Sequence, residues 1–290
     1  MAATMAQDIV PAAAILAPNG KQGKTVGTVM TGLLLGILLS RTVSGVVGEA
    51  FGWREMYQLA AVSIAIITAI MWKVLPRFTV HSTLSYPSLM FSMAQLWQRY
   101  STLRRAALAQ GFLSIAFSAF WSTLAVMLSE HYHMGSAIAG AFGIAGAAGA
   151  LAAPMAGHLA DKVGAAKVTQ LGALLVTVSF ALMFLLPALP VQGQWLLIAL
   201  SAVGFDLGLQ SSLVAHQNLV YSLEPLARGR LNALLFTMVF IGMALGSVLG
   251  SQVYALANWE GVVALATFSS AIALVIRLTG NPSLSKTSVA

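Results

Sequence analysis

The sequence predicts an all-α membrane protein made of two helix bundles, an incomplete N-terminal bundle and a complete six-helix C-terminal bundle. Of its 290 residues, 58% are hydrophobic and 8% are charged, whereas a soluble domain carries about a quarter charged residues. Eight stretches are long enough to cross a bilayer, which takes about 20 apolar residues. Because these stretches are uniformly apolar, without the alternation of barrel strands, we expect each of them to be a helix.

The predicted helices follow one another through short connections, except at one place. Their ranges are 26–47, 55–75, 107–129, 136–156, 168–189, 195–217, 231–253 and 261–279. Residues 2–17 are also apolar but contain Gln7, Asp8 and Pro11, so we expect them to be the end of a further helix. Because the chain has no cysteine, disulfides and thiolate metal sites are excluded.

The long connection, residues 76–106, is predicted to be a cytoplasmic linker that carries a helix lying in the membrane interface. One face of this helix would be apolar and the opposite face polar, as in other interfacial helices. The apolar face comprises Leu89, Met93, Leu96, Trp97, Tyr100 and Leu103, and the polar face comprises Gln95, Gln98, Arg99 and Thr102.

The net charge of +7 is concentrated in one set of loops. If successive loops alternate between the two sides of the membrane, thirteen basic residues fall on one side and only Arg54 on the other. An excess of Lys and Arg marks the cytoplasmic side. We therefore expect the cell (inner) membrane as the location, a cytoplasmic C-terminal tail at residues 280–290, and the lipid bilayer, with no nucleic acid, as the partner. The thirteen are Lys21, Lys24, Lys73, Arg77, Arg99, Arg104, Arg105, Lys162, Lys167, Arg228, Arg230, Arg277 and Lys286.

Two segments of the chain resemble each other, because the stretch that begins at Gly23 aligns without a gap with the stretch that begins at Gly229. Each starts with a basic turn and ends at a tryptophan, Trp53 or Trp259, so the two repeats run in the same direction. Parallel repeats of this kind occur in transporters. Helices from residue 107 onward would have counterparts before Met1, so we expect a truncated form that lacks about one hundred residues of its first half, roughly three to four helices.

A loop between two predicted helices reads GHLADKVGAAKV, from Gly157 to Val168. It resembles the loop motif of the major facilitator superfamily. Glycine permits the tight turn, and the charged residues can pair across the two helix ends. The matching positions are Gly157, Asp161, Lys162, Gly164 and Lys167.

A second resemblance is to the fifth helix of the drug:proton antiporter-like efflux branch of that superfamily. It rests on Gly32, Gly36, Arg41 and Gly45 and on the GWR sequence at residues 52–54. The Gly-Pro pair that is usual in that helix is absent here. The resemblance is therefore specific for the superfamily and weak for the substrate.

The resemblance implies two bundles of six helices, a substrate cavity between them, and alternating access from the two sides of the membrane. Residues 1–75 would be the remainder of the N-terminal bundle, from the end of helix 4 through helices 5 and 6, and residues 107–279 would be the C-terminal bundle. The implied function is proton-coupled efflux of a small molecule. The alternative is a non-transporting membrane fragment or an assembly or receptor-like protein.

Asp206 is the candidate transport residue, because an acid in the middle of a membrane span usually faces a bundle interior or a wet cavity. Gln210 lies one turn later on the same helix face. Asp206 could couple transport to protons, contact a cationic or hydroxylated substrate, or form a structural pair with Arg41. Glycine rows are predicted to be places where helices approach closely; they include Gly32, Gly36 and Gly45, and Gly242, Gly246 and Gly250.

The remaining polar residues do not predict enzyme chemistry. Glu130, His131 and His133 lie at a predicted helix end, where we expect no metal site. His216 is expected to anchor its helix at the membrane interface. Phe205 stands where the G-x-G-D motif of membrane aspartyl proteases has glycine, and H-E-x-x-H is absent. We therefore expect neither enzyme activity nor a cofactor.

Overall fold

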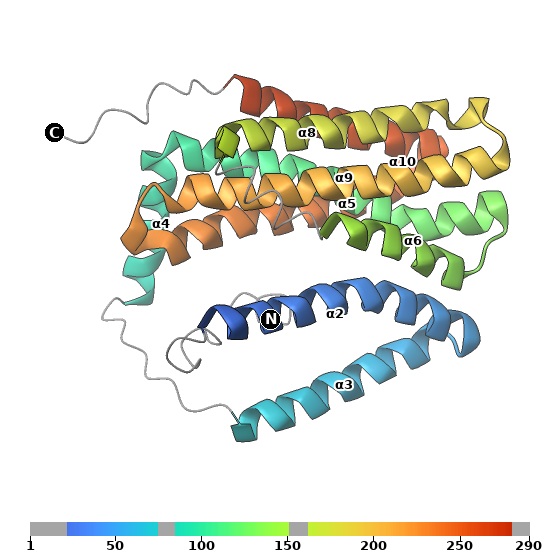
Figure 1. Cartoon of the computed structure of the whole chain (residues 1–290), viewed down its shortest axis with the longest axis horizontal. Helices are drawn as coiled ribbons and strands as arrows, with labels where there is room; N and C mark the ends of the chain where they lie inside the picture. Colours follow the sequence, from blue (N-terminus) through green and yellow to red (C-terminus); the bar gives the residue numbers. More distant parts are fainter. Residues whose placement is uncertain (1–21, 75–84, 151–161, 280–290) are drawn as a thin grey trace.

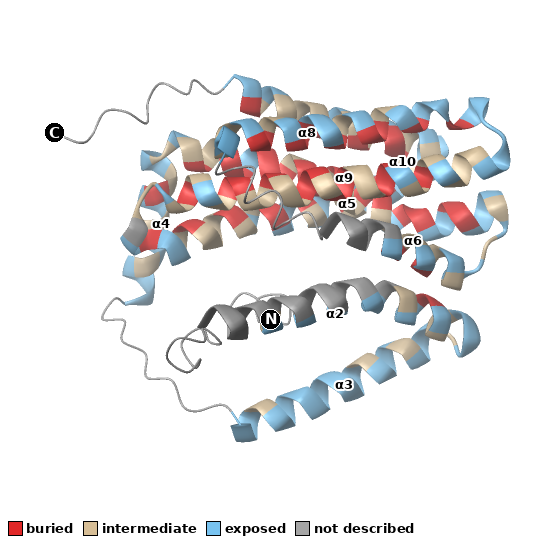
Figure 2. Ribbon diagram, in the orientation of Figure 1, coloured by how far each residue is buried: buried red, intermediate tan, exposed pale blue. Residues whose placement is uncertain are grey.

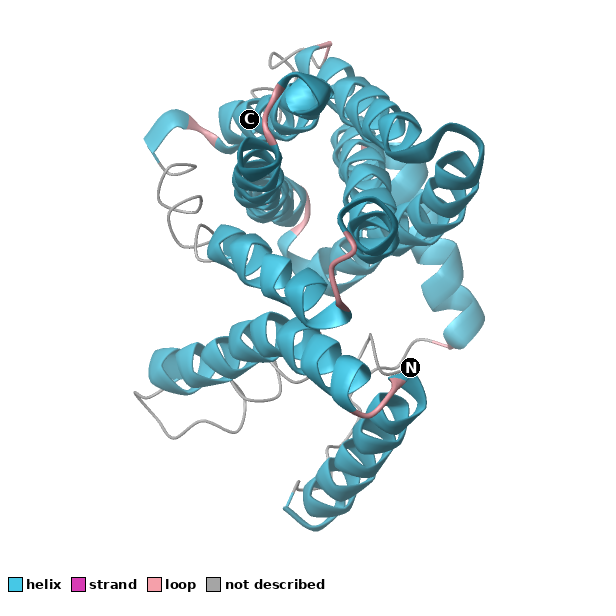
Figure 3. Ribbon diagram, turned by 90° about the vertical axis from the view of Figure 1, so that its right-hand side faces the viewer, coloured by secondary structure: helices cyan, strands magenta, loops and turns pink. Residues whose placement is uncertain are grey.

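The computed structural model describes residues 22–74, 85–150 and 162–279, and every regular element in these ranges is a helix (Figure 1). This architecture confirms the predicted fold class. Viewed along the helices, the same ranges contain helices and connecting loops only (Figure 3). The elements are α2 (Gln22–Ala50), α3 (Trp53–Val74), α4 (Tyr86–Arg99), α5 (Ser101–Tyr132), α6 (Ser136–Ala150), α8 (Ala165–Leu182), the 3-10 helix η1 (Met183–Ala188), α9 (Val191–Tyr221), the 3-10 helix η2 (Pro225–Ala227) and α10 (Arg228–Leu278).

Five helices of the described ranges are long and apolar enough to span a membrane: α3, α5, α8 together with η1, α9 and α10. The 51 residues of α10 would extend about 75 Å if straight, more than twice the bilayer core. A break at Ala257 and Asn258, where the backbone is not helical, divides α10 into two arms. These arms correspond to the two predicted spans 231–253 and 261–279.

The break in α10 has the same backbone character as the turn between α2 and α3. Gly52 has φ of +107° and Asn258 has φ of +52°, both in the left-handed region, and each directly precedes one of the aligned tryptophans. The two turns therefore occupy equivalent places in the aligned segments. This equivalence supports the internal repeat detected in the sequence.

The core lies among α5, α8, α9 and α10, where the buried residues gather (Figure 2). α5 packs along α10, and α8 packs along α9. At the centre, the rings of Phe180 and Phe205 stack with centroids 4.6 Å apart, and Phe120 meets Phe205 edge-on at 4.8 Å. This aromatic cluster joins three helices and fixes the rotation of α9 in the bundle.

α2 and α3 lie beside this core (Figure 1). α2 packs against α6, where Ser136 Oγ donates a hydrogen bond of 2.9 Å to the carbonyl oxygen of Gly45. Glu49 accepts a 2.7 Å bond from the backbone N–H of Ala137 and so caps the first turn of α6. α3 packs on α2 and has no buried residue among those described.

The predicted interfacial helix is α4, and its apolar face packs on the bundle. Leu96 is buried together with Leu103 and Leu231, while Gln95 and Gln98 on the opposite face are exposed. α5 begins at Ser101, earlier than the predicted start at residue 107, because the first turns of this helix are already buried beneath α4.

The helices run between two ends of opposite charge. One end holds the α2–α3 and α5–α6 turns and the break in α10, and we call it the acidic end. Its acids are Glu49, Glu55, Glu130 and Glu260. The other end holds α4 and η2 and we call it the basic end; its residues include Arg99, Arg104, Arg105, Lys167, Arg228, Arg230 and Arg277.

Candidate functional site

Asp206 lies in the middle of α9 and is 4% exposed. On the side of α9 that carries Gly204 and Gly208, the helix touches α8 closely: a Cβ at Gly208 would lie 2.6 Å from the carbonyl oxygen of Gly172. Residues two positions apart lie on nearly opposite faces of a helix. Asp206 is therefore turned away from α8, toward the side on which α5 and α6 pack.

Gln210 and Arg41 were predicted to act with Asp206, and the structure describes the side chain of only the first. Gln210 is half-buried, one turn after Asp206 on α9. The side chain of Arg41 lies outside the described part of the structure. Its helix, α2, packs on α6, and α6 packs on α9, so α6 connects the helix of Arg41 to the helix of Asp206.

A second polar group lies in the bundle interior, around His216, and the sequence did not predict this position for it. His216 is fully buried, so the expectation that it anchors α9 at the membrane interface is wrong. Its Nδ1 lies 2.9 Å from Oε1 of Gln110 in α5. Nearby, Arg277 is 8% exposed and donates from Nε to the hydroxyl oxygen of Thr169 in α8 at 2.9 Å.

We call Gln110, Thr169, His216 and Arg277 the His216 cluster. The hydrogen bond between Gln110 and His216 links α5 to α9, and the one between Arg277 and Thr169 links α10 to α8. Because four different helices contribute these side chains, the cluster joins α5, α8, α9 and α10 near the basic end. A signal was present in the sequence, since Gln110 and His216 are polar residues inside apolar spans.

The loop motif is described only in part. Gly157 and Asp161 lie outside the described residues. Gly164 has φ of +91° and directly precedes α8, which is the tight turn that glycine allows. Lys162 and Lys167 are exposed at the basic end.

The predicted packing glycines divide into two groups. Gly242, Gly246 and Gly250 face α5, where an added Cβ would meet backbone atoms of Gly111, Ile115 and Ala119, and Gly45 faces Ser136 and Gly140 of α6. At Gly32 and Gly36, by contrast, no described atom lies within 4 Å of an added Cβ. In the described structure, these last two positions of α2 do not have the close helix contact that was expected.

The described residues line two cavities at the acidic end. One, of about 750 Å³, lies between α2 and α3 on one side and α5 and α6 on the other, and includes Ser44, Tyr57 and Trp121. The other, of about 620 Å³, lies within the C-terminal helices around Trp259. Asp206 is not among the described residues that line either cavity. The described ranges contain no cluster of three His, Asp or Glu side chains that could hold a metal.

Two curated transporters are similar to this chain. An uncharacterized transporter, YgaY, of Escherichia coli O157:H7 is 36% identical over 262 residues, which cover 89% of this chain and 64% of that protein. The multidrug resistance protein MdtG of Proteus mirabilis is 26% identical over 248 residues, which cover 82% of this chain and 59% of that protein. The chain thus spans less than two thirds of the length of these relatives.

The helical arrangement also matches a solved structure. It is the crystal structure of a bacterial homologue of the human lysosomal transporter Spinster, in an inward-facing and unoccupied conformation. The TM-score is 0.59 at 14% sequence identity, with 92% of this chain and 71% of that chain covered. At this level of identity the likeness shows the fold alone.

The sequence profile of the Major Facilitator Superfamily matches residues 2–220 and, in a second match, residues 106–289. The second match starts inside the first, as expected for a chain whose two parts are related repeats. Together they cover almost the whole sequence, including every described helix. The chain therefore belongs to the Major Facilitator Superfamily of membrane transporters.

Proposed function

We propose that the protein acts in proton-coupled efflux of a small molecule by alternating access, with Asp206 as the residue that takes up and releases the proton. The observation that carries this proposal is the burial of Asp206 in the middle of a membrane-spanning helix. A charge at the centre of a bilayer costs at least about 2.5 kcal/mol, and intramembrane acids accordingly mark ion and proton pathways.

Two further observations support transport across the membrane by this route. The cavity of about 750 Å³ between α2–α3 and α5–α6 is within the size range of ligand pockets, and the similarity to MdtG favours export.

The proposal includes the placement in the membrane and the division of the chain. The basic end faces the cytoplasm of the cell, and the C-terminus lies on that side. Residues 1–75 belong to the N-terminal bundle, residues 107–279 form the C-terminal bundle, and α4 lies between them as an interfacial helix.

The decisive variant is Asp206→Asn, which keeps the shape and hydrogen-bonding capacity of the side chain but removes its titratable proton. The protein is reconstituted in vesicles that contain a pH-sensitive dye, and proton flux is followed as a panel of organic compounds is added on one side. We expect the wild type to exchange protons for at least one compound and Asp206→Asn to lose this exchange. Asp206→Glu should recover it in part, and Glu224→Gln, at the basic end, should not change it.

Downhill movement of the same compound, measured without a pH gradient, separates the possible roles of Asp206. If Asp206 couples transport to protons, Asp206→Asn should lose proton exchange but retain downhill movement of the compound. If Asp206 binds the substrate, the variant should lose both. Unchanged proton exchange in Asp206→Asn would refute the coupling role. Loss of folded protein, seen by size exclusion, would indicate a structural pair, and absence of flux in the wild type would favour a non-transporting or receptor-like protein.

A further inference from the structure

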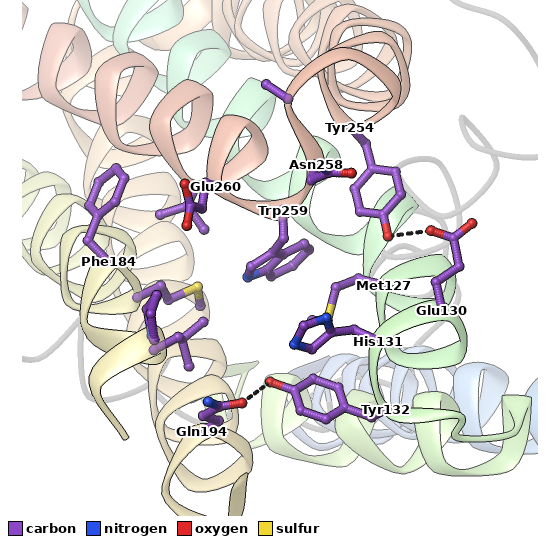
Figure 4. A pocket seen from close by; sticks show the side chains of 15 residues that line it. Met127, Glu130, His131, Tyr132, Phe184, Gln194, Tyr254, Asn258, Trp259 and Glu260 are labelled. Carbon is purple, nitrogen blue, oxygen red and sulfur yellow. Dashed lines mark hydrogen bonds between the residues drawn. The ribbon is translucent and has the colours of Figure 1, made fainter. Parts of the chain in front are cut away.

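The cavity around Trp259 lies in the C-terminal helices at the acidic end, apart from Asp206, and it is shown in Figure 4. α5 contributes Glu130, His131 and Tyr132, α9 contributes Gln194, and the break in α10 contributes Tyr254, Asn258, Trp259 and Glu260. Its volume of about 620 Å³ falls within the range of small-molecule sites. We call it the Trp259 cavity.

Two of the polar side chains of this cavity carry negative charge. Glu130 and Glu260 both line it, and no Lys or Arg is present among the described lining residues. Glu130 is fixed in place, because its Oε2 accepts a 2.8 Å hydrogen bond from the hydroxyl of Tyr254. Glu260 is exposed and lies on the opposite side of Trp259 from Glu130 (Figure 4). An occupant of matching charge is therefore a cation.

The aromatic side chains are held in fixed positions around the same space. Tyr132 donates a 2.6 Å hydrogen bond to Oε1 of Gln194, whose Nε2 donates to the carbonyl oxygen of Leu189 at 2.9 Å. Trp259 is supported from the core by Phe120, with ring centroids 5.5 Å apart. Its indole Nε1 is buried and has no hydrogen-bond partner in the described part of the chain.

Rigid aromatic rings beside carboxylates form the environment that recognises organic cations, because the ring faces and the carboxylates attract the same positive charge. A small, strongly hydrated metal ion would instead require several converging oxygen or nitrogen ligands. The described residues contain no group of three or more His, Cys, Asp or Glu side chains that could hold a metal ion. The lining thus selects a cation with apolar substituents.

We propose that the Trp259 cavity binds an organic cation of the ammonium or phosphonium class. The positive centre lies near Trp259, with Glu130 on one side and Glu260 on the other, and the apolar substituents lie against Tyr132, Tyr254 and the indole ring. Free organic cations and the ammonium headgroups of lipids share this chemistry. The site is separate from Asp206, so its occupancy does not depend on the proton-coupling role of that residue.

The probe is tetraphenylphosphonium, and tetraphenylborate serves as an anion of the same shape. Binding to the purified chain in detergent is measured by equilibrium dialysis, with empty micelles subtracted. We expect tetraphenylphosphonium to bind more tightly than tetraphenylborate, and the double variant Glu130→Gln/Glu260→Gln to weaken its binding at least about tenfold. The matched control is Glu55→Gln, which removes an acid from the same end but outside this cavity.

Two further variants separate a loss of binding from a loss of folding and from a loss of transport. Glu130→Asp/Glu260→Asp retains both charges and should bind more tightly than the double Gln variant. Asp206→Asn should bind like the wild type. Equal binding of the two probe ions, or unchanged affinity in the double Gln variant, would overturn the proposal. Displacement of the probe by a short-chain phosphocholine lipid assigns the site to a lipid headgroup, and its failure to displace assigns the site to a free cation.

Discussion

Nδ1 of His216 in α9 lies 2.9 Å from the side-chain amide oxygen of Gln110 in α5, and both side chains are at most 1% exposed. The geometry makes the imidazole the donor and Gln110 the acceptor. In a bundle interior this bond satisfies two polar groups that would otherwise be buried without a partner. Removing one of these two side chains should therefore lower the free energy of unfolding more than removing both.

Gln110→Leu should destabilise the folded protein by about 1–3 kcal/mol, because it leaves a ring nitrogen of His216 buried without an acceptor. Thermal unfolding in detergent, followed by size exclusion, measures the effect as a lower midpoint temperature. The double variant Gln110→Leu/His216→Leu should be more stable than the sum of the single losses predicts. Gln98→Leu, at an exposed position of α4, is the control. Simple additivity would contradict the pairing.

Gly246→Ala should destabilise the bundle, because the added Cβ would meet the carbonyl oxygen of Ile115 in α5. The contact is with backbone, which cannot rotate away, so the cost should be about 1–3 kcal/mol, as for other overpacked positions. Gly36→Ala makes the same change where no described atom lies within 4 Å. A lower midpoint temperature for Gly246→Ala alone confirms the α5–α10 contact; equal shifts in both variants would argue against it.

The predicted spans agree well with the structure because length and hydropathy are local properties, and the bilayer imposes both. The direction in which each helix faces was harder to predict. In water, the polar stripe of a helix shows which face is exposed and therefore which face is buried. In lipid the exposed face is apolar too, so this distinction is lost. The sequence therefore signalled only that His216 is a polar residue within an apolar span, and the packing of α9 shows that it faces the interior.

Arg277 illustrates the same limit at a helix end. It was counted among the loop residues that mark the cytoplasmic side, yet it is 8% exposed and bonded to Thr169. Its partner is 108 positions away in the sequence, and only the packing of α8 against α10 brings them together. The turn at Asn258, by contrast, could be predicted, since the aligned segment has glycine at the equivalent position.

Tyr100 should titrate at higher pH than an ordinary tyrosine. Burial and the 3.0 Å hydrogen bond from its hydroxyl to Oε2 of Glu224 raise the pKa of Tyr100. A raised pKa means that the folded state holds the proton more tightly. The contribution of Tyr100 to the free energy of unfolding is therefore complete below about pH 10, the pKa of tyrosine in the unfolded chain. This contribution is lost as the pH rises through the pKa of the folded state.

Ultraviolet difference titration of wild type against Tyr100→Phe isolates this group, with Tyr86→Phe as a control for an exposed tyrosine of α4. Glu224→Gln should lower the titration midpoint of Tyr100 toward the ordinary value, because it removes the negative charge while retaining an acceptor. A midpoint that does not respond to Glu224→Gln would show that the contact does not influence Tyr100.

The orientation in the membrane can be tested at two exposed leucines on either side of the first arm of α10. Leu226 in η2 is 96% exposed at the basic end, and Leu256 is 86% exposed next to the break at the acidic end. The chain has no cysteine, so Leu226→Cys and Leu256→Cys each introduce a single reactive thiol. If the basic end is cytoplasmic, an impermeant maleimide should label Leu256→Cys in intact cells and Leu226→Cys only after permeabilisation.

Phe51→Cys extends this test to the internal repeat. Phe51 is 73% exposed at the α2–α3 turn, in the segment that aligns with the break in α10. Parallel repeats place equivalent turns on the same side of the membrane, whereas inverted repeats place them on opposite sides. Phe51→Cys should therefore be labelled in intact cells, as Leu256→Cys is. Labelling of these two thiols from opposite sides would exclude a parallel repeat, and labelling of both only after permeabilisation would reverse the assignment of the acidic end.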